Sequence, residues 1–177
     1  MIIESKINPT DKQKELIEWI LTERSFPLFF LFNEPNQAPA FMHFLRKRNK
    51  DKLDVEGDVN SEFCEEFEQI FKDWAEQNSV EWNKILRTSI NFTTHQPPGS
   101  YAIHQDHHFP HKNWLVYLNE FTGGDTTFYK KLGDMNYKEI YHTNPKKYGV
   151  VMSDGEPHDA GFCAPHEIRV VMVVTFN

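Results

Sequence analysis

The sequence has few cysteines, no signal peptide and no long apolar run. Cys64 and Cys163 are the only cysteines in 177 residues, too few for the disulfide framework of a small secreted protein. The longest apolar run, residues 27–32, is far shorter than the roughly 20 residues that span a bilayer. Residues 1–6 include no apolar signal-peptide core. We therefore expect a reducing, cytoplasmic setting and no membrane partner.

Positive charge is also scarce. The chain has 19 Lys and Arg against 26 Asp and Glu, a formal net charge of −7. Non-specific binding to nucleic acid depends on clustered Lys and Arg, so we expect no nucleic-acid partner. The one basic run, residues 46–50, is short and soon followed by acids, which favours a solvated turn.

Aromatic residues, in contrast, are abundant. They make up 14% of the chain, with 15 Phe, and the hydrophobic fraction is 39%. Disordered chains lack such bulky apolar side chains, and the length suits one domain with a real core. We expect a single domain over residues 1–177, with helical support over about 1–80 and a β core over about 84–177.

Two amphipathic helices are predicted in the first part, with a strand pair between them. Thr10 and Gln13 form a capping-box pattern for a helix that continues to Glu23. A second helix is predicted over residues 61–78, where an aromatic stripe indicates core packing. From residue 84 onward, short β-rich runs alternate with turn residues, and they predict strands at Ile85–Thr94, Tyr101–Asp106, Trp114–Leu118, Thr126–Tyr129, Tyr137–His142, Tyr148–Met152 and Ile168–Phe176. Such spacing favours a mainly β jelly roll with supporting α-helices.

Histidines suggest the chemistry. Five of the nine fall within seventeen residues: His95, His104, His107, His108 and His111. His104 and Asp106 are two apart, so on an extended strand both would face the same side, about 7 Å apart. His158, four predicted strands later, is the best third ligand, and His108 is the reserve. Two imidazoles and one carboxylate leave one face of a metal open, as in non-haem Fe(II) oxygenases.

Arg169 adds a second element. It opens residues 169–176, the most β-branched run in the chain, which predicts a central strand. A guanidinium in so apolar a strand is costly without a partner, and its fork matches a carboxylate. A bound dicarboxylic acid would supply that partner.

In this order the motifs resemble those of the 2-oxoglutarate- and Fe(II)-dependent oxygenases, specifically small prolyl-4-hydroxylase-like members. The resemblance covers roughly residue 90 to the C-terminus. The segment 26–30, before a long helix, also resembles a phage and marine-bacterial subgroup, for which the location would be the host cytoplasm. The matching residues are His104-Gln105-Asp106, Val116-Tyr117-Leu118-Asn119, Gly123-Gly124-Asp125-Thr126-Thr127-Phe128, His158 and Arg169.

The resemblance implies a double-stranded β-helix with His104, Asp106 and His158 as catalytic iron ligands. It implies that Arg169 grips the far carboxylate of 2-oxoglutarate and that Tyr117 directs its hydroxyl to the same carboxylate. The implied cofactors are Fe(II), 2-oxoglutarate as co-substrate, O₂ and ascorbate. The implied reaction is the hydroxylation of a prolyl residue in a peptide, or of a small molecule, with decarboxylation of 2-oxoglutarate to succinate.

The chain departs from the family pattern in two places. Where relatives place a glycine six residues before the first histidine, this chain has Pro98, with Gly99 one later. His95 falls near another co-substrate position, nine residues before His104, where many relatives have tyrosine. After His158, residues 159–161 replace the expected small residue and valine.

Several of these residues also have purely structural explanations. His107 and His111, with His108, lie just past the His104-x-Asp106 pair in a segment with Pro110, which favours a surface loop at the mouth. Gly123 and Gly124 are typical of a hairpin turn that needs positive φ.

Trp82 and Trp114 suit either core or pocket wall, and Tyr117 could be a core tyrosine. A cupin-like metal binder or non-oxygenase metalloenzyme with the same three ligands is the alternative function, because these ligands suit several divalent metals. A structural module is a further alternative. Arg169 distinguishes the oxygenase from the cupin-like metal binder, because only a keto-acid co-substrate needs this cation.

Overall fold

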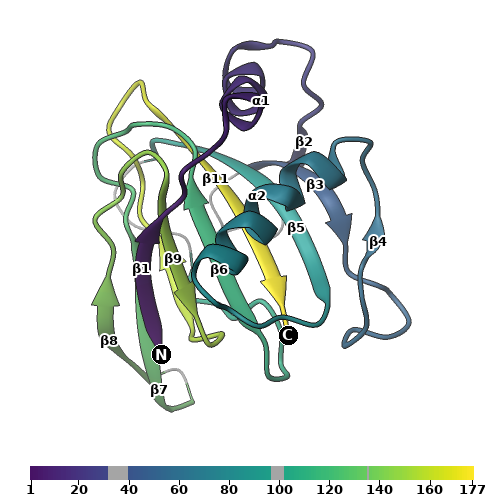
Figure 1. The fold of residues 1–177 in the computed structure, drawn as a ribbon. Coiled ribbons are helices and arrows are strands. Elements are labelled where there is room, and N and C mark those ends of the chain that lie inside the picture. Colours follow the sequence, from purple (N-terminus) through teal and green to yellow (C-terminus); the bar gives the residue numbers. More distant parts are fainter. Residues whose placement is uncertain (32–39, 97–101, 135) are drawn as a thin grey trace.

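The computed structural model describes residues 1–31, 40–96, 102–134 and 136–177 (Figure 1). It is mainly β, with two helices. In chain order the elements are β1 (Ile2–Lys6), α1 (Asp11–Thr22), β2 (Phe29–Leu31), β3 (Ala40–Lys47), β4 (Asp58–Val59), α2 (Cys64–Gln77), β5 (Ile85–Thr94), β6 (Lys112–Tyr117), β7 (Thr126–Gly133), β8 (Asn136–His142), β9 (Gly149–Ser153), β10 (His158–Ala160) and β11 (Ile168–Phe176).

The strands form two antiparallel sheets, the jelly-roll arrangement that the sequence predicts. The larger sheet has the order β1-β9-β6-β11-β5-β3-β2, with β4 paired to β3. The smaller sheet has the order β10-β7-β8. β11 lies between β5 and β6 and pairs with both, so the β-branched run is a central strand, as predicted.

Alternation along β11 gives the large sheet two different faces. Val170, Met172 and Val174 belong to the main core with the helices, whereas Val171 and Val173 pack with residues of the smaller sheet. α2 lies across the outer face of the large sheet (Figure 1). The helices therefore support one face, and the other face is left to line the space between the sheets.

Both predicted helices are present within a few residues of their expected ends. Thr10 accepts a bond from the Gln13 backbone, and the Gln13 side chain accepts one from Thr10 N, so the capping box is complete. In α2 the aromatic stripe is core, with Phe67, Phe71 and Trp74 at 0 to 1% exposed. Trp74 also donates its indole N–H to Ser5 Oγ on β1.

One predicted strand is wrong. Tyr101 lies outside the described residues, and residues 102–106 contribute only an isolated bridge between His104 and His158. The prediction fails because β6 begins at Lys112 after an irregular segment, so the motif lies on a loop instead of an extended strand. Strands β1 and β10 were not anticipated, and β1, β2 and β3 from the first part of the chain join the large sheet.

The basic run is also not a solvated turn. Arg46 lies on β3 and forms a two-pronged ion pair with Glu68 of α2, through Nε at 2.7 Å and Nη2 at 2.9 Å. Both side chains are nearly buried, at 11% and 2% exposed. Arg48 lies near Asp106. Residues two apart on a regular strand face the same side, but β3 has an irregularity between Phe44 and Arg46 and ends at Lys47. Arg46 therefore faces α2, whereas Arg48 lines the cavity between the sheets.

Both cysteines are buried and free. Burial raises the pKa of the Cys64 thiol to about 12, which keeps it protonated. Among the described residues, neither helix has the length and apolar character needed to span a bilayer.

Candidate metal centre and adjoining cavity

A cavity of about 520 Å³ lies between the two sheets. Its floor is the inner face of the large sheet, including Arg87, Asn91 and Thr93 of β5. Phe128 and Ala160 line it from the smaller sheet. This volume lies in the range of small-molecule sites, so the fold encloses space for a ligand beside the predicted ligand residues.

His104, Asp106 and His158 come together at this cavity, and all three line it. The backbones of His104 and His158 exchange two hydrogen bonds of 2.9 Å. Their rings lie 4.6 Å apart between centroids, and His158 Nε2 is 3.7 Å from Asp106 Oδ2. Residues 52 or more positions apart in the chain are thus neighbours, as the sequence predicts.

Both imidazoles are held in the same way. His104 Nδ1 lies 3.0 Å from the carbonyl of Ala102, and His158 Nδ1 lies 3.0 Å from the carbonyl of Glu156. A carbonyl only accepts, so each Nδ1 donates and each Nε2 keeps its lone pair. A carbonyl acceptor for the second ring nitrogen is typical of metal-ligating histidines.

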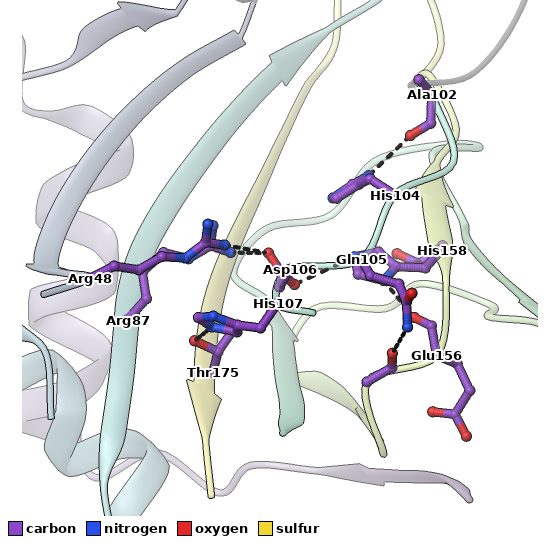
Figure 2. A network of polar contacts seen from close by, with 12 residues as sticks. Arg48, Arg87, Ala102, His104, Gln105, Asp106, His107, Glu156, His158 and Thr175 are labelled. Atoms are coloured by element: carbon purple, nitrogen blue, oxygen red, sulfur yellow. Dashed lines mark hydrogen bonds and ion pairs between the residues drawn. The ribbon is translucent and has the colours of Figure 1, made fainter. Parts of the chain in front are cut away.

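Asp106 is held between two cations and the histidines. Arg87 Nη2 donates to its Oδ1 at 2.5 Å, and Arg48 Nη2 is 3.5 Å from the same oxygen. Figure 2 shows both arginines approaching from one side and His158 lying on the other. Burial raises the pKa of Asp106, but Arg87 and His158 outweigh it and hold the pKa well below its ordinary value. Asp106 is therefore an anion.

The donor set fits a divalent metal. Asp106 Oδ2 is buried without a hydrogen bond among the described residues, and it faces His158 Nε2. Burial lowers the pKa of His158, which favours the neutral imidazole that a metal requires. No three such side chains of the described part of the chain already converge at metal-binding distance. Donors on one ion lie about 3 Å apart, and His158 Nε2 and Asp106 Oδ2, at 3.7 Å, are close to that spacing.

Arg169, the second residue of β11, lines the same cavity. It is only 3% exposed. Its Nε donates to the Gly124 carbonyl at 2.8 Å and its Nη2 donates to Thr126 Oγ1 at 3.0 Å. The ring of Tyr117 lies 5.5 Å from its guanidinium carbon. These contacts fix a buried cation at the cavity wall.

The other two predicted co-substrate contacts do not line the cavity. The Tyr117 hydroxyl bonds to Thr126 Oγ1 at 3.0 Å and Thr143 Oγ1 at 2.7 Å. Because Arg169 also donates to Thr126 Oγ1, Tyr117 helps to position this partner of Arg169. His95 is exposed, and its Nδ1 bonds to the Cys163 carbonyl. Neither is among the cavity-lining residues, and Pro98 and Gly99 lie outside the described residues.

The exposed fractions of the remaining histidines and tryptophans show which of them lie at the surface and which in the interior. The prediction of a surface loop is wrong for His107 and His111, which are 5% and 6% exposed. His107 bonds to Thr175 Oγ1 of β11 and packs against Phe109. This part of the segment therefore packs against the inner face of the large sheet. His108 is exposed and does not line the cavity.

Trp114 is fully buried core, and Trp82 is 37% exposed and packs on Phe71. Neither tryptophan lines the cavity.

Gly123 and Gly124 have the predicted positive φ, at 70° and 64°. They do not form a hairpin, however, because β6 and β7 lie in different sheets. They make the turn between the sheets instead. An added Cβ at Gly124 would lie 3.1 Å from Arg169 Cδ, so this turn also shapes the Arg169 site.

Sequence reasoning missed Arg48 and Arg87. The clue for Arg87 was in β5, where Leu86 and Ile90 alternate with the polar residues Arg87 and Asn91. Such a strand has one polar inner face, which indicates a cavity instead of a core. No comparable pattern marks Arg48, since its contact with Asp106 depends on the folded loop.

The two paired sheets have the fold of solved 2-oxoglutarate- and Fe(II)-dependent oxygenases. No protein-family model and no curated protein sequence matches the chain. Solved structures do match. A Burkholderia pseudomallei oxidoreductase of the 2OG-Fe(II) oxygenase family is 12% identical with a TM-score of 0.70, over 99% of this chain and 84% of that one.

Two prolyl hydroxylases are also similar. The Pseudomonas putida prolyl-4-hydroxylase is 14% identical with a TM-score of 0.57, over 99% of this chain and 91% of that one. The prolyl hydroxylase of Trichoplax adhaerens, solved with a peptide of hypoxia inducible factor, is 9% identical with a TM-score of 0.63, over 99% and 82%. At these identities the likeness concerns the fold.

Proposed function

We propose that the protein is a 2-oxoglutarate- and Fe(II)-dependent dioxygenase that hydroxylates a peptide prolyl residue or a small molecule. One observation carries the proposal: a buried arginine, Arg169, lines the same cavity as His104, Asp106 and His158. A metal site alone needs no second cation, whereas a dicarboxylic keto acid that binds the metal at one end needs one at the other.

Each residue then has a distinct part. His104 and His158 bind Fe(II) through Nε2, and Asp106 binds it through the unpaired Oδ2. Arg169 pairs with the far carboxylate of 2-oxoglutarate and fixes its orientation. When bound, Fe(II) supplies the activation of O₂, which side chains alone lack. One oxygen atom enters the substrate C–H bond to give C–OH, and the other enters succinate as CO₂ leaves.

The apolar lining of the cavity would exclude water from the reaction. Leu115, Val173 and Phe128 line it, and all three are less than 10% exposed. Such a lining keeps water away from reactive species. The peptide bound by the Trichoplax enzyme makes a peptide substrate plausible for this fold, and a small molecule suits the size of the cavity.

The cupin-like alternative is tested by separating metal binding from keto-acid binding. Arg169→Ala is expected to weaken 2-oxoglutarate binding to the Mn(II)-loaded protein by about tenfold to a hundredfold, with Mn(II) affinity unchanged. Arg169→Lys keeps the charge without the fork and should be intermediate. The exposed Arg24→Ala is the matched control. Equal 2-oxoglutarate affinity in folded Arg169→Ala protein would favour the alternative.

A further inference from the structure

The end of the cavity away from Arg169 contains a row of polar residues. Ser153 of β9 pairs with Asn113 of β6, Asn113 pairs with Thr175 of β11, and Thr175 pairs with Arg87 of β5. These four residues thus run side by side across the large sheet, on its inner face. Arg48, at the end of β3, adds a second cation beside Arg87.

On β9, β6 and β11 an apolar row separates these residues from Arg169. That row is Val151, Leu115 and Val173, which are neighbours in register. On β5 the inner face stays polar from Arg87 through Ser89 and Asn91 to Thr93. Arg169 pairs with Thr93, six residues along β5 from Arg87, which corresponds to roughly 20 Å along the strand. The cavity floor therefore has two polar, cationic ends with the iron-binding residues beside the Arg87 end.

The charges at one end do not balance. At the Arg87 end, Arg48 and Arg87 line the cavity against one carboxylate among the described lining residues, that of Asp106. One Fe(II) and one 2-oxoglutarate dianion would cancel each other and leave this excess unchanged. Asp106 is bonded closely to Arg87 at 2.5 Å, but lies 3.5 Å from Arg48. Arg48 is thus the less well-compensated cation, although the protein as a whole has a net charge of −7.

Several polar atoms at the same end have no hydrogen bond among the described residues. They are Arg48 Nε, Arg87 Nε, Ser153 Oγ and both side-chain polar atoms of Asn113, and Ser89 Oγ and Asn91 Oδ1 continue the series along β5. Buried polar atoms are costly unless paired. The group around Arg48 therefore indicates that a polar ligand completes these atoms.

We propose that the molecule to be oxidised binds at this end as a carboxylic acid, with Arg48 pairing with its carboxylate and Asn113 and Ser153 bonding its other polar groups. This assignment rests on the proposed function, because it gives the second substrate of that reaction a chemical class. A carboxylate suits Arg48 because one planar guanidinium matches one planar anion. The substrate is therefore a free organic acid or an acidic group of a peptide.

The test is a binding titration on protein loaded with Mn(II) and saturated with 2-oxoglutarate without O₂. The probes are acid and amide pairs: acetate and acetamide, proline and prolinamide, and 4-methylpentanoate and 4-methylpentanamide. A capped tripeptide with central glutamate, against its glutamine counterpart, separates the peptide source from the free acid. We expect at least one acid to bind about tenfold or more tightly than its amide.

Variants assign that preference to Arg48. Arg48→Gln should remove this preference for the acid, while the affinity for 2-oxoglutarate, measured at an Mn(II) concentration that saturates each variant, stays within twofold. Asn113→Ala should weaken acid and amide alike. Lys47→Gln removes the same charge from the neighbouring, exposed residue and should change neither.

The contrary results are distinct. Normal Mn(II) and 2-oxoglutarate binding with no acid preference, or a preference that survives in Arg48→Gln, would overturn this inference alone. Loss of 2-oxoglutarate affinity in Arg48→Gln would place Arg48 in the co-substrate site and also overturn it. Absence of Mn(II) or 2-oxoglutarate binding in the unmodified protein would instead overturn the proposed function.

Discussion

At the scale of single residues, the two oxygens of Asp106 have different environments. Oδ1 accepts from Arg87, while Oδ2 has no hydrogen bond within the described part of the chain and lies 3.7 Å from His158 Nε2. Because Arg87 fixes one oxygen, it orients the other toward the proposed metal position. The motif spacing made Asp106 predictable. The polar alternation of β5 marks Arg87 as inward-facing but does not tell that its partner is a carboxylate on a distant loop.

Arg87→Gln is therefore expected to weaken metal binding although Arg87 is not a ligand. Loss of a group that orients a metal ligand costs about tenfold to a hundredfold in affinity. Calorimetric titration with Mn(II) measures the effect, and Lys47→Gln is the control for the lost charge. Unchanged Mn(II) affinity in folded Arg87→Gln protein would show that Asp106 needs no such support.

The Arg46 and Glu68 pair gives a prediction about stability. Burial raises the pKa of Glu68, but its bonds from Arg46 and Thr88 outweigh this and hold the pKa below its ordinary value. Glu68→Gln should lower the free energy of unfolding at pH 7 by about 3 kcal/mol, measured by urea denaturation. The exposed Glu66→Gln should change it by less than about 0.5 kcal/mol.

The same pair fixes the direction of a pH effect. A carboxyl with a depressed folded pKa stabilises fully above its unfolded pKa, about 4.3 for Glu, and loses that contribution as the pH falls through the folded value. The stability gap between the unmodified protein and Glu68→Gln should therefore narrow below about pH 4. A gap that widens on acidification would contradict the assigned pKa direction.

At the scale of elements, the two longest strands were predictable, whereas the short strands β1 and β10 were not. β5 and β11 match their predicted bounds because β-branched and aromatic residues recur throughout their nine or ten residues. The three-residue β10 has no such pattern, and its position depends on pairing with β7. Residues 102–106, predicted as part of a strand, contain one strong strand-forming residue, Ile103, and contribute only an isolated bridge.

The turn between the sheets gives an element-scale prediction. Gly124→Ala would strain a backbone at φ 64° and place a methyl group 2.9 Å from Phe121 and 3.1 Å from Arg169. We expect the free energy of unfolding to fall by about 1–3 kcal/mol and the binding of 2-oxoglutarate to weaken. Gly133→Ala, which has open space around it, is the matched control. Unaltered 2-oxoglutarate affinity in Gly124→Ala would show that this turn does not shape the Arg169 site.

At the scale of the whole molecule, the fold joins residues that the sequence separates. His104, His158 and Arg169 lie on a loop and two different sheets, yet all line one cavity. Their order along the chain was enough to predict this gathering by resemblance. The cationic excess inside an acidic protein was not predictable, because net charge does not tell which arginines face inward.

The most direct test of the whole account is the conversion of 2-oxoglutarate by purified, iron-loaded protein. With Fe(II), O₂ and ascorbate, we expect slow formation of succinate even without the second substrate, followed by mass spectrometry. His158→Ala protein should form none. Well-folded protein that binds one Fe(II) per chain and forms no succinate above the His158→Ala background would contradict the account.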